Sequence, residues 1–119
     1  MKKVFICSAL RGDVAENIKK AKEYCLWAML TYGVLPIAPH IYFTQFLNDN
    51  KSAERELGIN AGIELLKTCS ELWYFGDRVS RGMVKEINVA KSLGIKVKYI
   101  DRKELNMNNN WRKLHEYSL

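Results

Sequence analysis

Short runs of β-forming residues alternate with longer segments of helical periodicity along the chain. Four such runs, at 4–8, 34–38, 72–75 and 95–100, are separated by three helical segments. Strands joined through helices make right-handed crossovers, which place the strands in a parallel sheet covered by helices. The pattern predicts an α/β, Rossmann-like (flavodoxin-like) domain with three layers and a mostly parallel sheet of about four strands.

The ends of the first helical segment are marked by capping residues. Asp13 can cap the start, with Glu16 placed three residues later as in a capping box, and Gly33 ends the segment. The second segment, about 52–69, contains Gly58 and Gly62 one turn apart. Such a pair lowers helix stability and permits close packing, either within the chain or against a neighbouring chain.

The segment between the second strand and the second helix is rich in polar and aromatic residues. It runs over residues 39–50 and is predicted as a long loop, a kind of segment that usually carries function or moves. His40 in this loop could line a base pocket or be a hydrogen-bonded structural histidine. Pro36 indicates that the preceding strand is an edge or irregular strand.

The stretch 76–94 reads as a tight loop followed by a helix. Ser80 is a good N-cap, and Gly82 leaves the backbone of the first turn open to a ligand. The free N–H groups at such an end attract anions. Glu86 lies one turn further in, where it is either a nucleophile beside this anion site or an ordinary residue of the helix surface.

In sheets of this type the ligand lies beyond the carboxyl ends of the strands where the winding reverses, here between the first strand and the third. Two loops should meet there. They supply the candidate site residues Ser8, Arg11, Gly12, Asp77, Ser80, Gly82 and Glu86. The sequence has no GxGxxG after the first strand and no GxxxxGK[ST], which argues against dinucleotide oxidoreductases and P-loop NTPases.

The composition indicates one compact domain. The chain has 119 residues, 48% of them hydrophobic, and no apolar run long enough to span a bilayer, so we expect a cytoplasmic protein. Its three cysteines are scattered, which favours reduced, buried thiols over a disulfide framework or a zinc site. No metal or cofactor is predicted.

The formal net charge of +6 is compatible with nucleic acid, an anionic metabolite or solubility alone. The basic residues are spread along the chain, and no zinc-finger, RNP or helix-turn-helix signature accompanies them. Nucleic-acid binding is therefore not favoured. A phosphate-bearing small molecule fits the charge equally well.

Three motifs resemble the nucleoside 2-deoxyribosyltransferase superfamily, including its branch of 2′-deoxynucleoside 5′-monophosphate N-glycosidases and small phage and bacterial relatives. They read Phe5-Ile-Cys-Ser-Ala-Leu-Arg-Gly-Asp13, Pro36-Ile-Ala-Pro-His40 and Gly76-Asp-Arg-Val-Ser-Arg-Gly-Met-Val-Lys-Glu86. The resemblance covers about residues 3–101. We expect the domain to span 1–101 and a tail to span 102–119, with a possible short helix at 111–117.

The resemblance implies that Glu86 attacks the anomeric carbon of deoxyribose, giving a covalent deoxyribosyl-enzyme that water hydrolyses or a second base captures. It assigns phosphate and sugar contacts to Arg11, Gly12, Ser80 and Gly82. Asp77 is our candidate for the acid that helps the base depart.

Two functions from different classes remain open. The first is an N-glycosidase or 2-deoxyribosyltransferase, and the second is a non-catalytic module of phage or bacterial origin that binds a nucleotide in the same crevice. Relatives in the superfamily are commonly oligomers whose neighbours complete the site, so a homo-oligomer is expected, with its contact at the helix that holds Gly58 and Gly62.

Overall fold

The computed structural model describes residues 1–106, and the helix predicted at 111–117 lies outside that range. Four parallel strands form one sheet in the order β2-β1-β3-β4. This confirms the predicted α/β, Rossmann-like class. The strands are β1 (Lys3–Cys7), β2 (Leu35–Ile37), β3 (Glu71–Phe75) and β4 (Lys96–Ile100).

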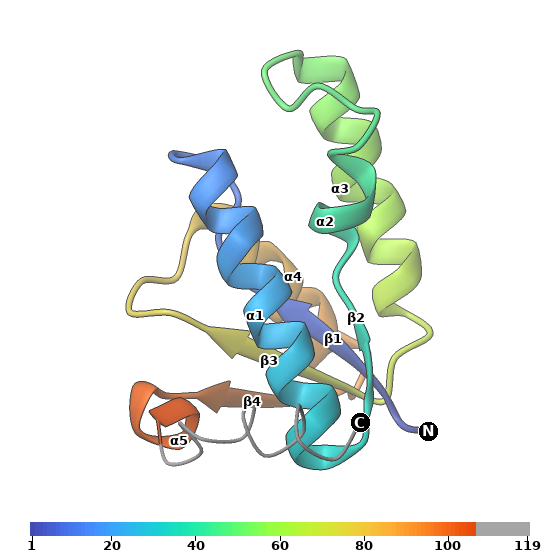
Figure 1. The fold of residues 1–119 in the computed structure, drawn as a ribbon. Coiled ribbons are helices and arrows are strands. Elements are labelled where there is room, and N and C mark those ends of the chain that lie inside the picture. Colours follow the sequence, from blue (N-terminus) through green and yellow to red (C-terminus); the bar gives the residue numbers. More distant parts are fainter. Residues whose placement is uncertain (107–119) are drawn as a thin grey trace.

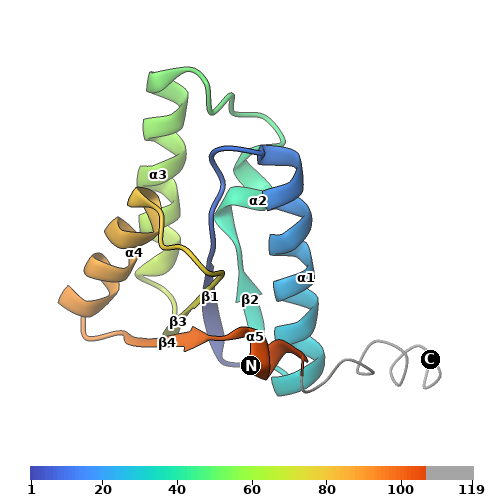
Figure 2. The ribbon, with the colours of Figure 1, turned by 90° about the vertical axis from the view of Figure 1, so that its left-hand side faces the viewer.

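Helices cover both faces of this sheet. In Figure 2 α1 lies on one side of the strands, and α3 and α4 lie on the other. No helix among residues 1–106 is long and apolar enough to cross a membrane. The helices are α1 (Val14–Tyr32), α2 (Pro39–Phe43), α3 (Ser52–Leu66), α4 (Arg81–Ser92) and α5 (Arg102–Asn106).

Successive side chains of β1 point to opposite faces of the sheet, and this divides the core into two layers. Val4 and Ile6 pack with Trp27 on the α1 side, while Phe5 and Cys7 pack in a second cluster with buried residues of α3 and α4. All four β1 residues have no exposed surface. Because a central strand of a parallel sheet is covered on both faces, such a continuous apolar run is what the fold requires.

The predicted capping residues of α1 and α4 are confirmed, whereas α3 ends at Leu66 rather than near residue 69. The Asp13 side chain accepts a hydrogen bond from the Glu16 N–H at 3.1 Å, and Gly33 ends α1 in the left-handed conformation with φ 64°. At α4 the Ser80 hydroxyl accepts from the Met83 N–H at 3.3 Å. These bonds satisfy N–H groups that a helix start otherwise leaves unpaired.

The segment after β2 differs from the predicted loop, because it begins with the short helix α2. Pro39 occupies its first turn, where the fixed φ of proline suits a helix and the missing N–H costs nothing. The Thr44 hydroxyl closes the other end by donating to the His40 carbonyl at 2.7 Å. The edge position predicted from Pro36 is confirmed, since β2 pairs with β1 alone.

Gly58 and Gly62 lie on the part of α3 that faces α2 and the segment after it. A Cβ atom at Gly62 would lie 3.5 Å from Pro39, and one at Gly58 would lie 3.4 Å from Leu47. Both glycines therefore face other parts of this chain at ordinary contact distances, and the predicted contact of this helix with a neighbouring chain stays a prediction. Figure 1 shows α2 and much of α3 extending beyond the end of the sheet.

Candidate active site

A cavity of about 310 Å³ lies where the loop after β1, the start of α4 and the segment α2–α3 meet. The sheet order reverses between β1 and β3, so this is the switch point at which such folds bind ligands. Six of the eight candidate residues line it. They are Ser8, Arg11, His40, Ser80, Gly82 and Glu86.

Glu86 projects from the second turn of α4 into this cavity. Its Oε1 atom accepts a hydrogen bond from the Cys7 thiol, with Sγ at 3.4 Å. Burial raises the pKa of Glu86 to about 7, and the bond from Cys7 acts in the opposite direction. The carboxyl group is therefore divided between its ionised and protonated forms near neutral pH.

Ser8 and His40 form a hydrogen-bonded pair on the cavity wall, with Oγ and Nε2 3.0 Å apart. Burial lowers the pKa of His40 to about 4, so its imidazole is neutral at physiological pH. A neutral imidazole and a hydroxyl can each donate and accept hydrogen bonds, as the binding of sugar hydroxyls or base edges requires.

The start of α4 is open to an anion. Gly82 lines the cavity, and no atom lies within 4 Å of the place where its Cβ would be. Arg11 lines the same region and pairs with Asp49, Nε to Oδ2 at 3.7 Å. The Asn17 amide fixes the Arg11 loop by donating to the Leu10 and Arg11 carbonyls, each at 3.0 Å. Helix N–H groups beside a cation favour phosphate or carboxylate.

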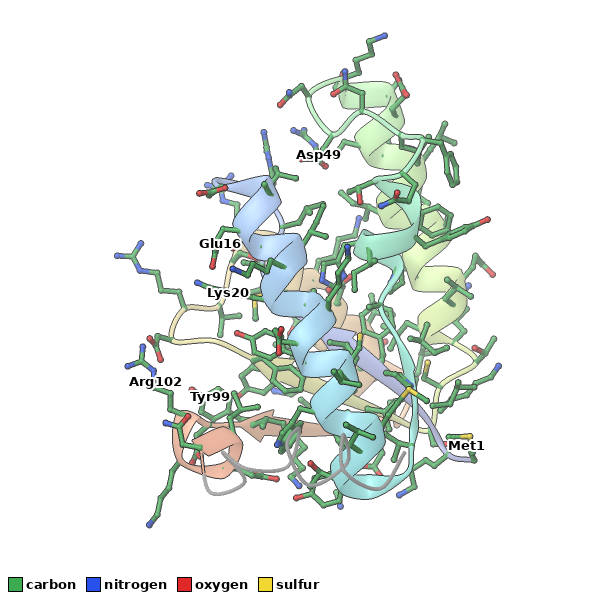
Figure 3. All side chains as sticks on the ribbon, in the orientation of Figure 1. Met1, Glu16, Lys20, Asp49, Tyr99 and Arg102 are labelled. Atoms are coloured by element: carbon green, nitrogen blue, oxygen red, sulfur yellow. The ribbon has the colours of Figure 1, made fainter. Side chains whose placement is uncertain are left out.

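Asp77 is not brought to Glu86. It is exposed, forms an ion pair with Arg102 and is absent from the cavity wall. Gly76, with φ 101°, turns the chain at this point. Figure 3 shows Arg102 far from Asp49, which lines the cavity. Asp77 is the acidic residue of the loop predicted to face Glu86, but its side chain pairs with Arg102 of α5 instead.

Gly12 also lies off the cavity wall, although its neighbour Arg11 lines it. Its φ of 100° lies in the region that favours glycine. Its contribution is therefore the shape of the loop that carries Arg11. The phosphate contact expected of Gly12 stays a prediction.

Several cavity residues were missed by the sequence reasoning. The segment α2–α3 contributes Asp49, Glu54 and Arg55 to the cavity wall, and Cys7 of β1, which is not part of the wall, is the hydrogen-bond partner of Glu86. The length and composition of residues 39–50 were a signal for the first of these groups. No signal in the sequence links Cys7 to Glu86, since they are 79 residues apart. Among the described residues, no group of His, Cys, Asp and Glu could hold a metal ion.

Comparisons with known proteins give a family and a fold. No curated protein matches the sequence. A 2-deoxyribosyltransferase from Bacillus psychrosaccharolyticus has a similar structure, with a TM-score of 0.62 and 16% identity over 83% of this chain and 72% of the other. At that identity the likeness shows the fold. Residues 2–100 match a family model, and the chain therefore belongs to the family described as Domain of unknown function (DUF7768).

Proposed function

We propose that this protein cleaves or transfers the N-glycosidic bond of 2′-deoxynucleosides or their 5′-monophosphates, with Glu86 as the nucleophile. The observation that carries the proposal is a partly buried carboxylate on the wall of a cavity at the switch point. The similar fold of a 2-deoxyribosyltransferase supports it. Burying a carboxylate costs free energy, so an apolar residue would serve packing better in this position.

In this proposal Glu86 attacks the anomeric carbon while the bond to the base breaks, and water or a second base then releases the sugar. Ser8 and His40 bind the deoxyribose or the base as neutral hydrogen-bonding groups. Arg11, Ser80 and Gly82 surround the open start of α4 and would receive a 5′-phosphate.

The departing base needs a proton, and Asp77 is poorly placed to supply it. Among the described residues on the cavity wall, the carboxyl groups besides Glu86 are those of Asp49 and Glu54. Asp49 pairs with Arg11, and Glu54 accepts from the Asn48 N–H at 3.1 Å. Both come from the wall that α2 and α3 form, so they are the acid candidates to test first.

A nucleotide-binding module without turnover is the second candidate. The displacement of Asp77 favours it, because a binder needs the cavity and its cations but no acid for the leaving group. The two candidates differ in what they require of Glu86. Only the enzyme needs an ionised carboxylate aimed at the sugar.

The first experiment incubates the protein with each 2′-deoxynucleoside and its 5′-monophosphate, with and without an acceptor base, and follows free base by chromatography. Base release by the parent and loss of release in Glu86→Ala and Glu86→Gln is the expected result. Glu64→Gln is the matched control, since Glu64 is an exposed α3 residue paired with Lys67. Binding of nucleotide without release of any base would reject the enzyme and favour the module.

The homo-oligomer and the cytoplasmic location stay predictions. Light scattering on the purified chain tests the first. If the protein is a monomer under conditions in which it releases base, the site needs no residue from a neighbouring chain.

A further inference from the structure

The contact between Cys7 and Glu86 joins the central strand to the proposed nucleophile. Cys7 is the last residue of β1, and its side chain has no exposed surface. Its Sγ atom lies 3.4 Å from Glu86 Oε1 and 3.9 Å from the Met83 carbonyl oxygen. The thiol can donate one hydrogen bond, and the shorter contact is to the carboxylate.

Cys7 provides the one hydrogen bond that the Glu86 carboxylate receives within residues 1–106. Oε1 is therefore held against the buried strand, while Oε2 has no protein donor in that part of the chain. Burial, together with the negative charge of Glu86, raises the pKa of the Cys7 thiol, which keeps its proton at any ordinary pH. The donor is thus permanent.

We infer that Cys7 is the positioning residue of Glu86, whose thiol holds Oε1 so that Oε2 is presented to the sugar. The catalytic consequence of this inference rests on the proposed function. The hydrogen bond between Cys7 and Glu86 is independent of that function. A thiol is a weak donor, so it orients the carboxylate without withdrawing much of the negative charge that attack requires. A strong donor at the same place would make a less reactive nucleophile.

Other groups around the cavity must be kept constant in a test of this inference. The remaining charged or titratable residues on its wall come from the β1 loop, α2, the start of α3 and the segment before it, and α4. They are Arg11, His40, Asp49, Glu54, Arg55 and Arg81. Substitutions at Cys7 leave all of these unchanged, so a change in the titration of Glu86 reports the lost bond.

The test uses the whole chain with ¹³C-labelled glutamate and follows the Glu86 carboxyl carbon by NMR as a function of pH, with Glu86→Gln identifying the signal. In Cys7→Ala the carboxyl should titrate at higher pH than in the parent, because the donor that favours its ionised form is gone. Cys7→Ser keeps a donor and should titrate at or below the parent value. Cys7→Val removes the donor but fills the space, and replaces alanine if that variant does not fold.

Cys69→Ala is the matched control. Cys69 is buried in the same cluster, and its thiol donates to the Leu65 carbonyl at 3.4 Å rather than to a carboxylate. Its removal should leave the Glu86 titration unchanged. A Glu86 titration that is the same in the parent, Cys7→Ala and Cys7→Val overturns the inference.

Kinetics separate the inference from the proposed function. If the protein releases base, Cys7→Ala should lower kcat about tenfold with little change in KM, and the rising limb of the pH profile should move to higher pH. Absence of base release in the parent rejects the proposed function, yet the NMR titration still decides whether Cys7 controls Glu86.

Discussion

Glu86 connects the chemistry of the site to the stability of the fold. Burial raises its pKa from 4.5 to about 7, so between these values the folded state holds a proton that the unfolded state has lost. Stability contributed by this group is therefore full below about pH 4.5 and falls as pH rises toward 7.

We predict that Glu86→Gln, which cannot ionise, is more stable than the parent at high pH. The difference should approach about 3 kcal/mol near pH 9 and should nearly vanish at about pH 3, where the parent carboxyl is protonated in both states. Urea unfolding of both proteins across this range measures it. Equal stability at high pH would mean that the ionised carboxylate is better solvated in the cavity than its burial indicates.

His40 has the opposite linkage. Burial lowers its pKa from 6.5 to about 4, so between these values the unfolded state binds a proton that the folded state excludes. The stability that neutral His40 contributes is complete above about pH 6.5 and is lost as pH falls toward 4.

His40→Gln keeps a hydrogen-bonding side chain for Ser8 but does not titrate. Compared with the parent, this variant should lose less stability between pH 6.5 and 4, by about 2 to 3 kcal/mol over the window. Thermal unfolding at both ends of the window checks the result. Parallel losses in the two proteins would show that other groups cause the acid sensitivity.

At the scale of single elements, the start of α4 has a local stabilising bond of its own. The Ser80 hydroxyl accepts from the Met83 N–H, and Ser80→Ala should cost about 1 kcal/mol in the free energy of unfolding because that N–H loses its partner. Ser92→Ala is the control at the other end of α4, where the hydroxyl donates to the Val89 carbonyl at 2.7 Å. A change of only a few tenths of a kcal/mol is expected there.

The contact between α2 and α3 makes a second prediction at this scale. Gly62→Ala should be tolerated and should add up to about 1 kcal/mol, because alanine favours a helix and its Cβ would lie at an ordinary 3.5 Å from Pro39. Gly62→Leu should instead displace α2 and weaken ligand binding. Unfolding midpoints and nucleotide titrations of the two variants test this. Destabilisation by alanine as large as that by leucine would contradict it.

The elements also show how far the sequence predicts this protein. The strands, the long helices and the switch point follow from periodicity and capping residues, because these signals are local. Helix α2 was missed since Pro39 signals a loop as readily as a first helical turn. The ion pair of Asp77 with Arg102 joins residues 25 positions apart, which no local signal predicts. The contact of Cys7 with Glu86 likewise exists only after β1 and α4 have packed.

At the scale of the whole molecule, the net charge of +6 should strengthen the binding of a phosphorylated ligand more than that of an uncharged one. Binding of a 2′-deoxynucleoside 5′-monophosphate should weaken severalfold when salt is raised from about 0.05 to about 0.5 M, because the ions screen its phosphate from the protein's cations. Binding of the uncharged nucleoside should hardly change. Calorimetric titration of Glu86→Ala, which lacks the proposed nucleophile, measures both.

Similar salt dependence for the two ligands would place the phosphate away from the arginines of the cavity. In that case Arg11 would serve chiefly its pair with Asp49.

The cavity is formed partly by the loop after β1 and the start of α4, and partly by α2 and α3, which extend beyond the end of the sheet (Figure 1). No described residue from 39 to 62 belongs to either buried core cluster, although this segment forms a whole wall of the cavity. The residues of this wall can therefore be changed while the two core clusters, one of which contains Cys7, keep their packing. For protein engineering, exchanging this segment between related chains should alter which ligand the cavity accepts, together with the acid candidates Asp49 and Glu54 that the segment carries, while the packing of the core is kept.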